Sequence, residues 1–198
     1  MKKIEFVYRE LLYQSLEKKN NKLTQLAIAS KLNISLSTVN YSLKPLRAMG
    51  AIDVKLKNFT VVDGKKILYY WASLRNINED IIYKTRVDKP IQKIESEMPA
   101  HVVYGAFTAY KFKFKDVPAD YSEVYVYGSD EIIDDIKKRF PGSKNTPNLF
   151  VLKKDSLMEN YGQITTLAQT FIDLWNLKEW YAKEFLMALE DKINRLMG

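Results

Sequence analysis

A set of polar and basic side chains within residues 35–57 has the chemistry needed to contact a nucleic acid. Its members are Ser35, Ser37, Thr38, Asn40, Tyr41, Lys44, Arg47, Lys55 and Lys57. Hydroxyl and amide groups hydrogen-bond to base edges, whereas ammonium and guanidinium groups bond to phosphate oxygens. The residue types therefore predict that this stretch contacts base edges and phosphates, and the helix-turn-helix described next makes double-stranded DNA the expected partner.

Two apolar rows would position most of these side chains on the second helix of a helix-turn-helix over residues 23–50. The first helix would bury Leu23, Leu26, Ala27, Ala29 and Leu32 after a cap at Thr24. Asn33-Ile34-Ser35 would form the turn, and Ser35 would cap the second helix. That helix would bury the stripe Leu36, Val39, Leu43 and Leu46. Such helices enter the major groove by their N-terminal part, so Ser37, Thr38 and Tyr41 should lie closest to the bases. The alternative is a solvated helix in an all-helical domain.

Two features after this helix complete the predicted DNA-binding domain. Pro45 is expected to kink the helix or end it near Lys44, which argues against Arg47 as a groove residue. Gly50 is expected to cap the helix in the left-handed conformation. Ile52, Val54 and Leu56 then alternate with polar residues, which predicts a strand that Phe59–Val62 pairs with after a bend at Asn58. The result is a winged helix, with Lys55 and Lys57 placed to hold phosphates.

The charge distribution supports the same partner. Residues 1–75 hold 14 lysines and arginines against 5 aspartates and glutamates, whereas residues 76–198 hold 17 against 19. The positive charge therefore belongs to the half with the helix-turn-helix, as expected for a protein that binds a polyanion.

Composition argues against several other classes. The chain has no cysteine and one histidine, so a thiolate or imidazole metal site is not expected. No apolar run is long enough to span a bilayer, and the first residues do not read as a signal peptide. We expect a cytoplasmic protein without membrane contact.

The remaining segments predict a two-domain chain of mixed α+β or α/β class. One helix is expected over residues 4–17, and a second over residues 63–75 with Asp63 as its cap. Residues 76–90 would be a linker, although IIYKTRV within it could be a strand. The second domain, 76–198, should alternate short strands (101–104, 123–127, 148–153) with helices (91–98, 106–114, 129–139), and helices 167–177 and 180–197 should close it.

The order of these segments resembles a known family. The winged helix is followed by VYGAFTAY at 103–110, the strand EVYVY at 123–127 and ITTLAQTFIDLW at 164–175. This layout resembles the AbiEi-type antitoxins, and more closely a set of archaeal transcriptional regulators, over nearly the whole chain. The resemblance implies a C-terminal domain of nucleotidyltransferase-like fold, and the antitoxin relatives repress their own promoters.

The sequence departs from the pattern of an active nucleotidyltransferase. Such enzymes have a Gly-Ser or Gly-Gly turn and two alternating carboxylates on the next strand, which hold magnesium. Here the turn is Gly105-Ala106, and Tyr125 stands where the second carboxylate would follow Glu123. We therefore predict no catalytic residue, cofactor or metal ion, and an interaction role for this domain.

Other tempting features have plainer explanations. Asp130, Glu131, Asp134 and Asp135 are more simply dipole partners of a helix than a cation site. His101 is expected at the surface. Trp71, Trp175 and Trp180 are expected in the core rather than around a ligand. The last helix carries an apolar stripe that would either cover its own sheet or form a homodimer.

These observations predict a sequence-specific transcriptional regulator, most simply a repressor. The alternatives are an antitoxin-like protein whose second domain binds a partner protein, and an active nucleotidyltransferase.

Overall fold

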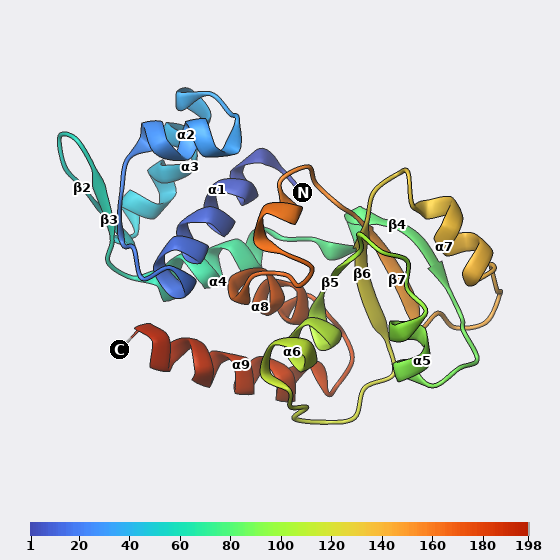
Figure 1. The fold of residues 1–198 in the computed structure, drawn as a ribbon. Coiled ribbons are helices and arrows are strands. Elements are labelled where there is room, and N and C mark those ends of the chain that lie inside the picture. The colour runs from blue at the N-terminus through green and yellow to red at the C-terminus, as the bar shows by residue number, and fades with distance from the viewer. Residues whose placement is uncertain (198) are drawn as a thin grey trace. The chain divides into compact units, whose positions relative to one another are not determined.

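A computed structural model describes residues 1–197 of the chain, with side chains to residue 196. The chain divides into two compact units (Figure 1). One contains Met1–Arg75, Thr166–Ala168 and Asp191–Gly198, and the other contains Asn76–Thr165 and Gln169–Glu190. Within the described residues, no helix is long and apolar enough to span a membrane.

The first unit is a winged helix-turn-helix, as predicted. Helix α1 (Lys3–Leu12) continues into a π-helical turn over Tyr13–Glu17. It is followed by β1 (Lys22–Leu23), α2 (Gln25–Leu32), α3 (Leu36–Ala48), β2 (Ile52–Val54), β3 (Phe59–Val61) and α4 (Gly64–Leu74). The three short strands form an antiparallel sheet in the order β1-β3-β2.

The buried face of α2 differs from the prediction. Leu23 lies in β1 rather than in the helix, Leu26 is 70% exposed, and Ala27 is also exposed. Ile28, Ala29 and Leu32 are buried instead. At 3.6 residues per turn, Leu26 lies on a different side of α2 from Ile28 and Leu32, and it is this other side that no element covers.

Helix α3 is continuous through Pro45, so of the two predicted alternatives, a kink or an end near Lys44, the end was wrong. Pro45 lies in the last turn but one, where it has no N–H to donate to the carbonyl of Tyr41. The helix instead ends before Gly50, whose φ of +70° is the predicted left-handed conformation.

Buried charged groups fix α1 against the other helices of this unit. The indole Nε1 of Trp71 in α4 donates to Oε2 of Glu5 at 3.0 Å, and the Arg75 guanidinium lies 3.7 Å from the same oxygen. Glu10 accepts from Nζ of Lys31 in α2 at 2.7 Å. A buried charge without such partners would cost several kcal/mol, on the order of 3–5, so these pairs set the relative positions of the three helices.

The second unit is built on a four-stranded sheet in the order β4-β7-β6-β5. Strands β6 and β7 are parallel, and the two edge strands are antiparallel to their neighbours. The strands are β4 (Ile81–Thr85), β5 (Val103–Tyr104), β6 (Val124–Gly128) and β7 (Leu149–Lys153). Its helices are α5 (Ile91–Ser96), α6 (Ala106–Phe114) and α7 (Ile133–Arg139), together with most of α8 (Leu167–Trp175) and the first part of α9 (Ala182–Met197).

Alternation along β6 assigns its residues to the two faces of the sheet. Val124 and Val126 join an aliphatic core with Ile94 of α5 and Ile136 of α7. On the other face, Tyr125 stacks on Phe150 of β7 with ring centroids 4.6 Å apart. Phe107 of α6 packs on that face against Tyr125, Tyr181 and Phe185.

Several predictions for this half need correction. Residues 81–85 form β4, so 76–90 is not a linker and the strand alternative was right. Helix α7 begins at Ile133 without a side-chain cap, because residues 130–132 form a turn. Trp175 and Trp180 are exposed, unlike the fully buried Trp71. In α9, Phe185, Leu189 and Ile193 are fully buried, whereas Leu196 of the same stripe is 37% exposed.

Candidate nucleic-acid interface

The N-termini of α2 and α3 are held by the two caps that the sequence predicted. Thr24 Oγ1 accepts from the backbone N–H of Ala27 at 3.1 Å, and Ser35 Oγ accepts from that of Thr38 at 3.1 Å. Between the helices, Asn33 adopts φ +50° and ψ +47°, which a short amide side chain tolerates. These local interactions set the angle at which α3 leaves α2.

Three hydroxyl groups gather at the start of α3. Ser35 Oγ lies 2.9 Å from Ser37 Oγ and 2.8 Å from Thr38 Oγ1. Ser35 therefore positions its neighbours, and Thr38 is half-buried beside it. Ser37, like Ser35, is exposed, and it lies at the helix end whose dipole favours an anion.

The exposed side of α3 forms a shallow hollow lined by the side chains that the sequence singled out. Its lining residues are Ser37, Thr38, Asn40, Tyr41 and Lys44. Tyr41 is exposed, and Nδ2 of Asn40 donates to Oε1 of Gln25 in α2 at 3.3 Å. Arg47 lies exposed on the same helix one turn after Lys44, because α3 continues past Pro45. The structure thus brings the polar residues of α3 together on one solvent-facing surface.

The wing is the hairpin of β2 and β3, in which Ile52 pairs with Val61 and Val54 pairs with Phe59. Its turn closes with a bond from the N–H of Lys55 to the carbonyl of Asn58, 2.8 Å long. Nζ of Lys55 lies 3.7 Å from Oδ2 of Asp53, and Lys57 is exposed. Both predicted phosphate ligands of the wing are therefore at its turn and accessible to solvent.

Sequence reasoning missed a groove between the wing and the two helix N-termini. Thr24, Gln25, Leu26, Leu36 and residues 55–58 line it. Leu36 and Leu56 had been assigned to buried rows, yet Leu36 is 49% exposed and Leu56 is 99% exposed. Leu56 lies two residues after Val54, the last paired residue of β2. Its closeness to the predicted bend at Asn58 was the one available signal that the inward alternation had ended.

The second unit contains the turn at Gly105 and the strand β6, whose residues the sequence compares with those of an active nucleotidyltransferase. A Cβ on Gly105 would lie 3.1 Å from the Tyr127 ring and 3.3 Å from Oδ2 of Asp173, so glycine permits close packing there. The Tyr127 hydroxyl donates to Oδ1 of Asp173 at 2.7 Å. Side chains of β6 and α8 therefore fill the space next to this turn.

The carboxylate of Glu123 is also engaged. It accepts a hydrogen bond from the Tyr181 hydroxyl, and burial raises the pKa of Glu123 above its ordinary value. The Tyr125 hydroxyl is directed to Glu179 at 3.5 Å, and burial raises the pKa of Tyr125 as well. The alternate positions 123 and 125 thus hold an engaged carboxylate and a buried phenol.

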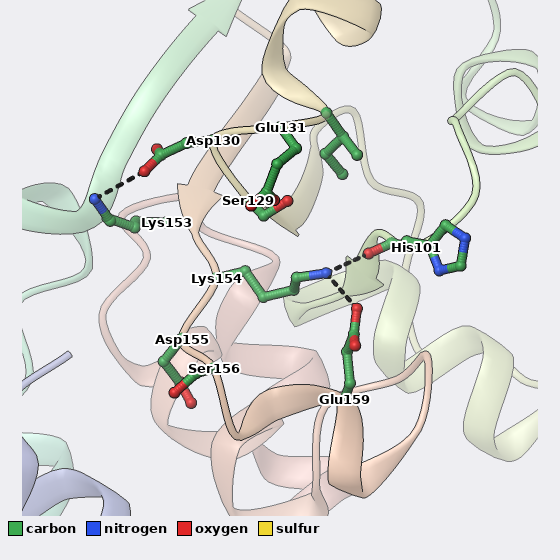
Figure 2. A pocket seen from close by; sticks show the side chains of 10 residues that line it. His101, Ser129, Asp130, Glu131, Lys153, Lys154, Asp155, Ser156 and Glu159 are labelled. Carbon is green, nitrogen blue, oxygen red and sulfur yellow. Dashed lines mark hydrogen bonds and ion pairs between the residues drawn. The ribbon is translucent and has the colours of Figure 1, made fainter.

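A pocket lies beside the ends of the parallel strands β6 and β7 (Figure 2). Nζ of Lys154 donates to Glu159 at 2.6 Å and to the carbonyl of His101 at 2.8 Å. Nζ of Lys153 lies 3.4 Å from Asp130. Each lysine is already neutralised by a carboxylate, and the exposed His101 turns its carbonyl, not its imidazole, toward Lys154. Among the described residues, no group of three or more histidine, aspartate or glutamate side chains could hold a metal ion.

Comparison with known proteins supports the assignment of the first unit. A family model described as winged helix-turn-helix DNA-binding matches residues 11–53, which include α2, α3 and the start of β2. No curated protein and no solved structure matches the chain. The chain therefore carries a winged helix-turn-helix DNA-binding domain.

Proposed function

We propose that this protein is a sequence-specific transcriptional regulator that represses the promoter it binds. The observation that supports the proposal best is the solvent-facing hollow on α3. Its lining presents hydroxyl, amide and ammonium groups on a helix whose other side is buried against α1 and α2. A surface of that size and composition fits base edges in the major groove, which admits one helix.

We assign the residues of the interface two roles. Ser37, Asn40 and Tyr41 read base edges, because they lie in the first two turns of α3 and have exposed polar atoms. Thr38 contributes through its hydroxyl beside Ser35, which caps the helix.

The basic side chains bind the sugar-phosphate backbone on either side of α3. They are Lys44, Arg47, Lys55 and Lys57, and all four are exposed. These contacts fix the position of the domain on the duplex and carry no sequence information themselves.

Binding to DNA upstream of the gene tests this proposal. Fluorescence anisotropy would compare that duplex with a scrambled duplex at two salt concentrations. We expect tighter binding to the native duplex, and weaker binding to both as salt rises. Equal affinity for the two duplexes would contradict sequence-specific regulation.

A variant of Tyr41 distinguishes a contact to a base from electrostatic attraction to any DNA. Tyr41 is 65% exposed, so Tyr41→Phe should leave the fold unchanged. Loss of one base contact should cost about 1–3 kcal/mol on the native duplex and little on the scrambled one. Lys144→Ala, at an exposed site in the second unit, serves as the control and should change neither affinity.

For the second unit, we propose a non-catalytic, nucleotidyltransferase-like interaction domain similar to that of AbiEi-type antitoxins. The support is the buried Tyr125 at the position of a second carboxylate, together with the engagement of Glu123 by Tyr181. A lone, hydrogen-bonded carboxylate is a poor ligand set for two magnesium ions.

Calorimetry with ATP and magnesium tests this assignment. We expect no saturable heat of binding. Saturable binding that Glu123→Ala abolishes would instead favour an active nucleotidyltransferase. Co-expression with the product of a neighbouring gene would test the antitoxin alternative, in which the second unit binds a partner protein; light scattering on the purified chain would test for a homodimer.

A further inference from the structure

Leu56 occupies an unusual place for a large apolar side chain. It lies in the turn of the wing between Lys55 and Lys57, and it is 99% exposed. Figure 1 shows the loop between β2 and β3 extending away from the helices of its own unit. Leu56 therefore has no packing role in the folded chain, and its apolar surface is available in full to a ligand.

Leu56 is not an isolated surface residue. It lines the same groove as Leu26 and Leu36, which come from the first turns of α2 and α3. Three exposed leucines from three separate elements thus surround one groove. Scattered apolar residues are ordinary on protein surfaces, but a group of them in one hollow marks an interaction site.

The charges around the groove identify its occupant as a polyanion. Lys55 and Lys57 stand on either side of Leu56, and Asp53 is the only carboxylate on the hairpin from Ile52 to Val61. The groove also joins the exposed face of α3, because Gln25 in its lining accepts a hydrogen bond from Asn40. A duplex held by α3 would therefore reach the wing as well.

We propose that Leu56 is an apolar wedge that enters the minor groove of the bound duplex and partly unstacks a base step. The inference rests on the proposed function, because it assigns a role within the same interface. With α3 in the major groove, phosphates of the strand beside it would meet Lys55 and Lys57. Leu56, between these lysines, would then meet the neighbouring minor groove.

Such a wedge adds a second source of specificity. Apolar side chains that insert between base pairs bend the duplex, and the cost depends on how easily the step deforms. Pyrimidine–purine steps such as TA and CA deform most easily. The protein should therefore prefer such a step at one fixed distance from the bases that α3 contacts.

The test uses duplexes of the upstream DNA with 2-aminopurine placed at successive positions. Its fluorescence rises when the base is unstacked. We expect the unaltered protein to raise this fluorescence at one step, and Leu56→Ala to abolish the rise and weaken binding about tenfold. Because Leu56 is uncharged, the dependence of affinity on salt should be unchanged in the variant.

Two further variants control the measurement. Val62→Ala removes another exposed aliphatic side chain just after β3, 59% exposed, and should leave both fluorescence and affinity unchanged. Leu56→Met keeps an apolar side chain of similar size and should restore the fluorescence rise.

The outcomes distinguish this inference from the function on which it rests. Specific binding without any fluorescence rise, or with a rise that survives in Leu56→Ala, would overturn the wedge and leave the regulator intact. If replacing thymine by uracil weakens binding and no base is unstacked, Leu56 contacts thymine methyl groups in the major groove. That result would also overturn the wedge. Absence of DNA binding by the unaltered protein would overturn both.

Discussion

Replacing Lys55 with alanine tests whether the wing contacts phosphates, and the structure sets the expected size of the effect. The side chain of Lys55 is 68% exposed, and its partner Asp53 is 55% exposed at an Nζ–Oδ2 distance of 3.7 Å. A solvated pair of this kind contributes about 0–1 kcal/mol to folding. The free energy of unfolding in urea should therefore change little, so an altered affinity reports on DNA contact.

The dependence of binding on salt gives the size of the effect expected for Lys55→Ala. Each phosphate contact contributes about 0.9 to the slope of log affinity against log salt concentration. Between about 50 and about 200 mM salt, losing one contact should make the fall in affinity about 3.5-fold smaller than in the unaltered protein. The loss should be similar on native and scrambled duplexes, because phosphates carry no sequence information.

Asp53→Asn, at the same turn, should change DNA affinity in the opposite direction. The attraction between unit charges 3.7 Å apart in water is about 1 kcal/mol, so removing Asp53 should tighten DNA binding by at most about sixfold. Fluorescence anisotropy of a labelled duplex measures both variants, with Lys144→Ala as the exposed control. Equal salt slopes for Lys55→Ala, the control and the unaltered protein would refute a phosphate contact at the wing.

Three further predictions concern the fold. Gly105→Ala would place a Cβ 3.1 Å from the Tyr127 ring, so we expect a loss of about 1–3 kcal/mol in urea unfolding. Thr24→Ala removes the cap of α2 and should cost about 1 kcal/mol by the same measurement, with weaker DNA binding. Burial raises the pKa of Glu123 above 4.5, so its contribution to stability is present below that pH and is lost as pH rises through the raised pKa. Glu123→Gln should therefore raise the melting temperature more at neutral pH than below pH 4.5. An equal change in melting temperature at the two pH values would contradict a raised pKa of Glu123.

The helix-turn-helix could be predicted because its determinants are local. The caps at Thr24 and Ser35, the left-handed residue at Asn33 and the apolar spacing from Val39 to Leu46 each act within a few residues of the chain. The hydrogen bonds that these residues make depend on neighbours that the sequence itself supplies. The two charge-bearing halves could be separated in the same way, by counting along the chain.

The tertiary structure decided which apolar residues are buried. Leu26, Leu36 and Leu56 fit apolar rows as well as their buried neighbours do, yet all three are exposed around one groove. Spacing gives the relative orientation of side chains on one element, but burial depends on which other elements cover that element. The caps of α2 and α3 lie where they were predicted, so Leu26 and Leu36 are exposed because no other element covers them, whereas Leu56 is exposed because β2 ends at Val54.

The same distinction holds in the second unit. The sequence by itself determined that Tyr125, and not a second carboxylate, takes the alternate position after Glu123, since this needs only the order of residues along one strand. That Tyr125 stacks on Phe150 and that Tyr181 donates to Glu123 was decided by the pairing of β6 with β7 and by the packing of distant segments. Residue types fix which chemistry is available, whereas contacts between residues far apart in the sequence decide which groups remain accessible to perform it.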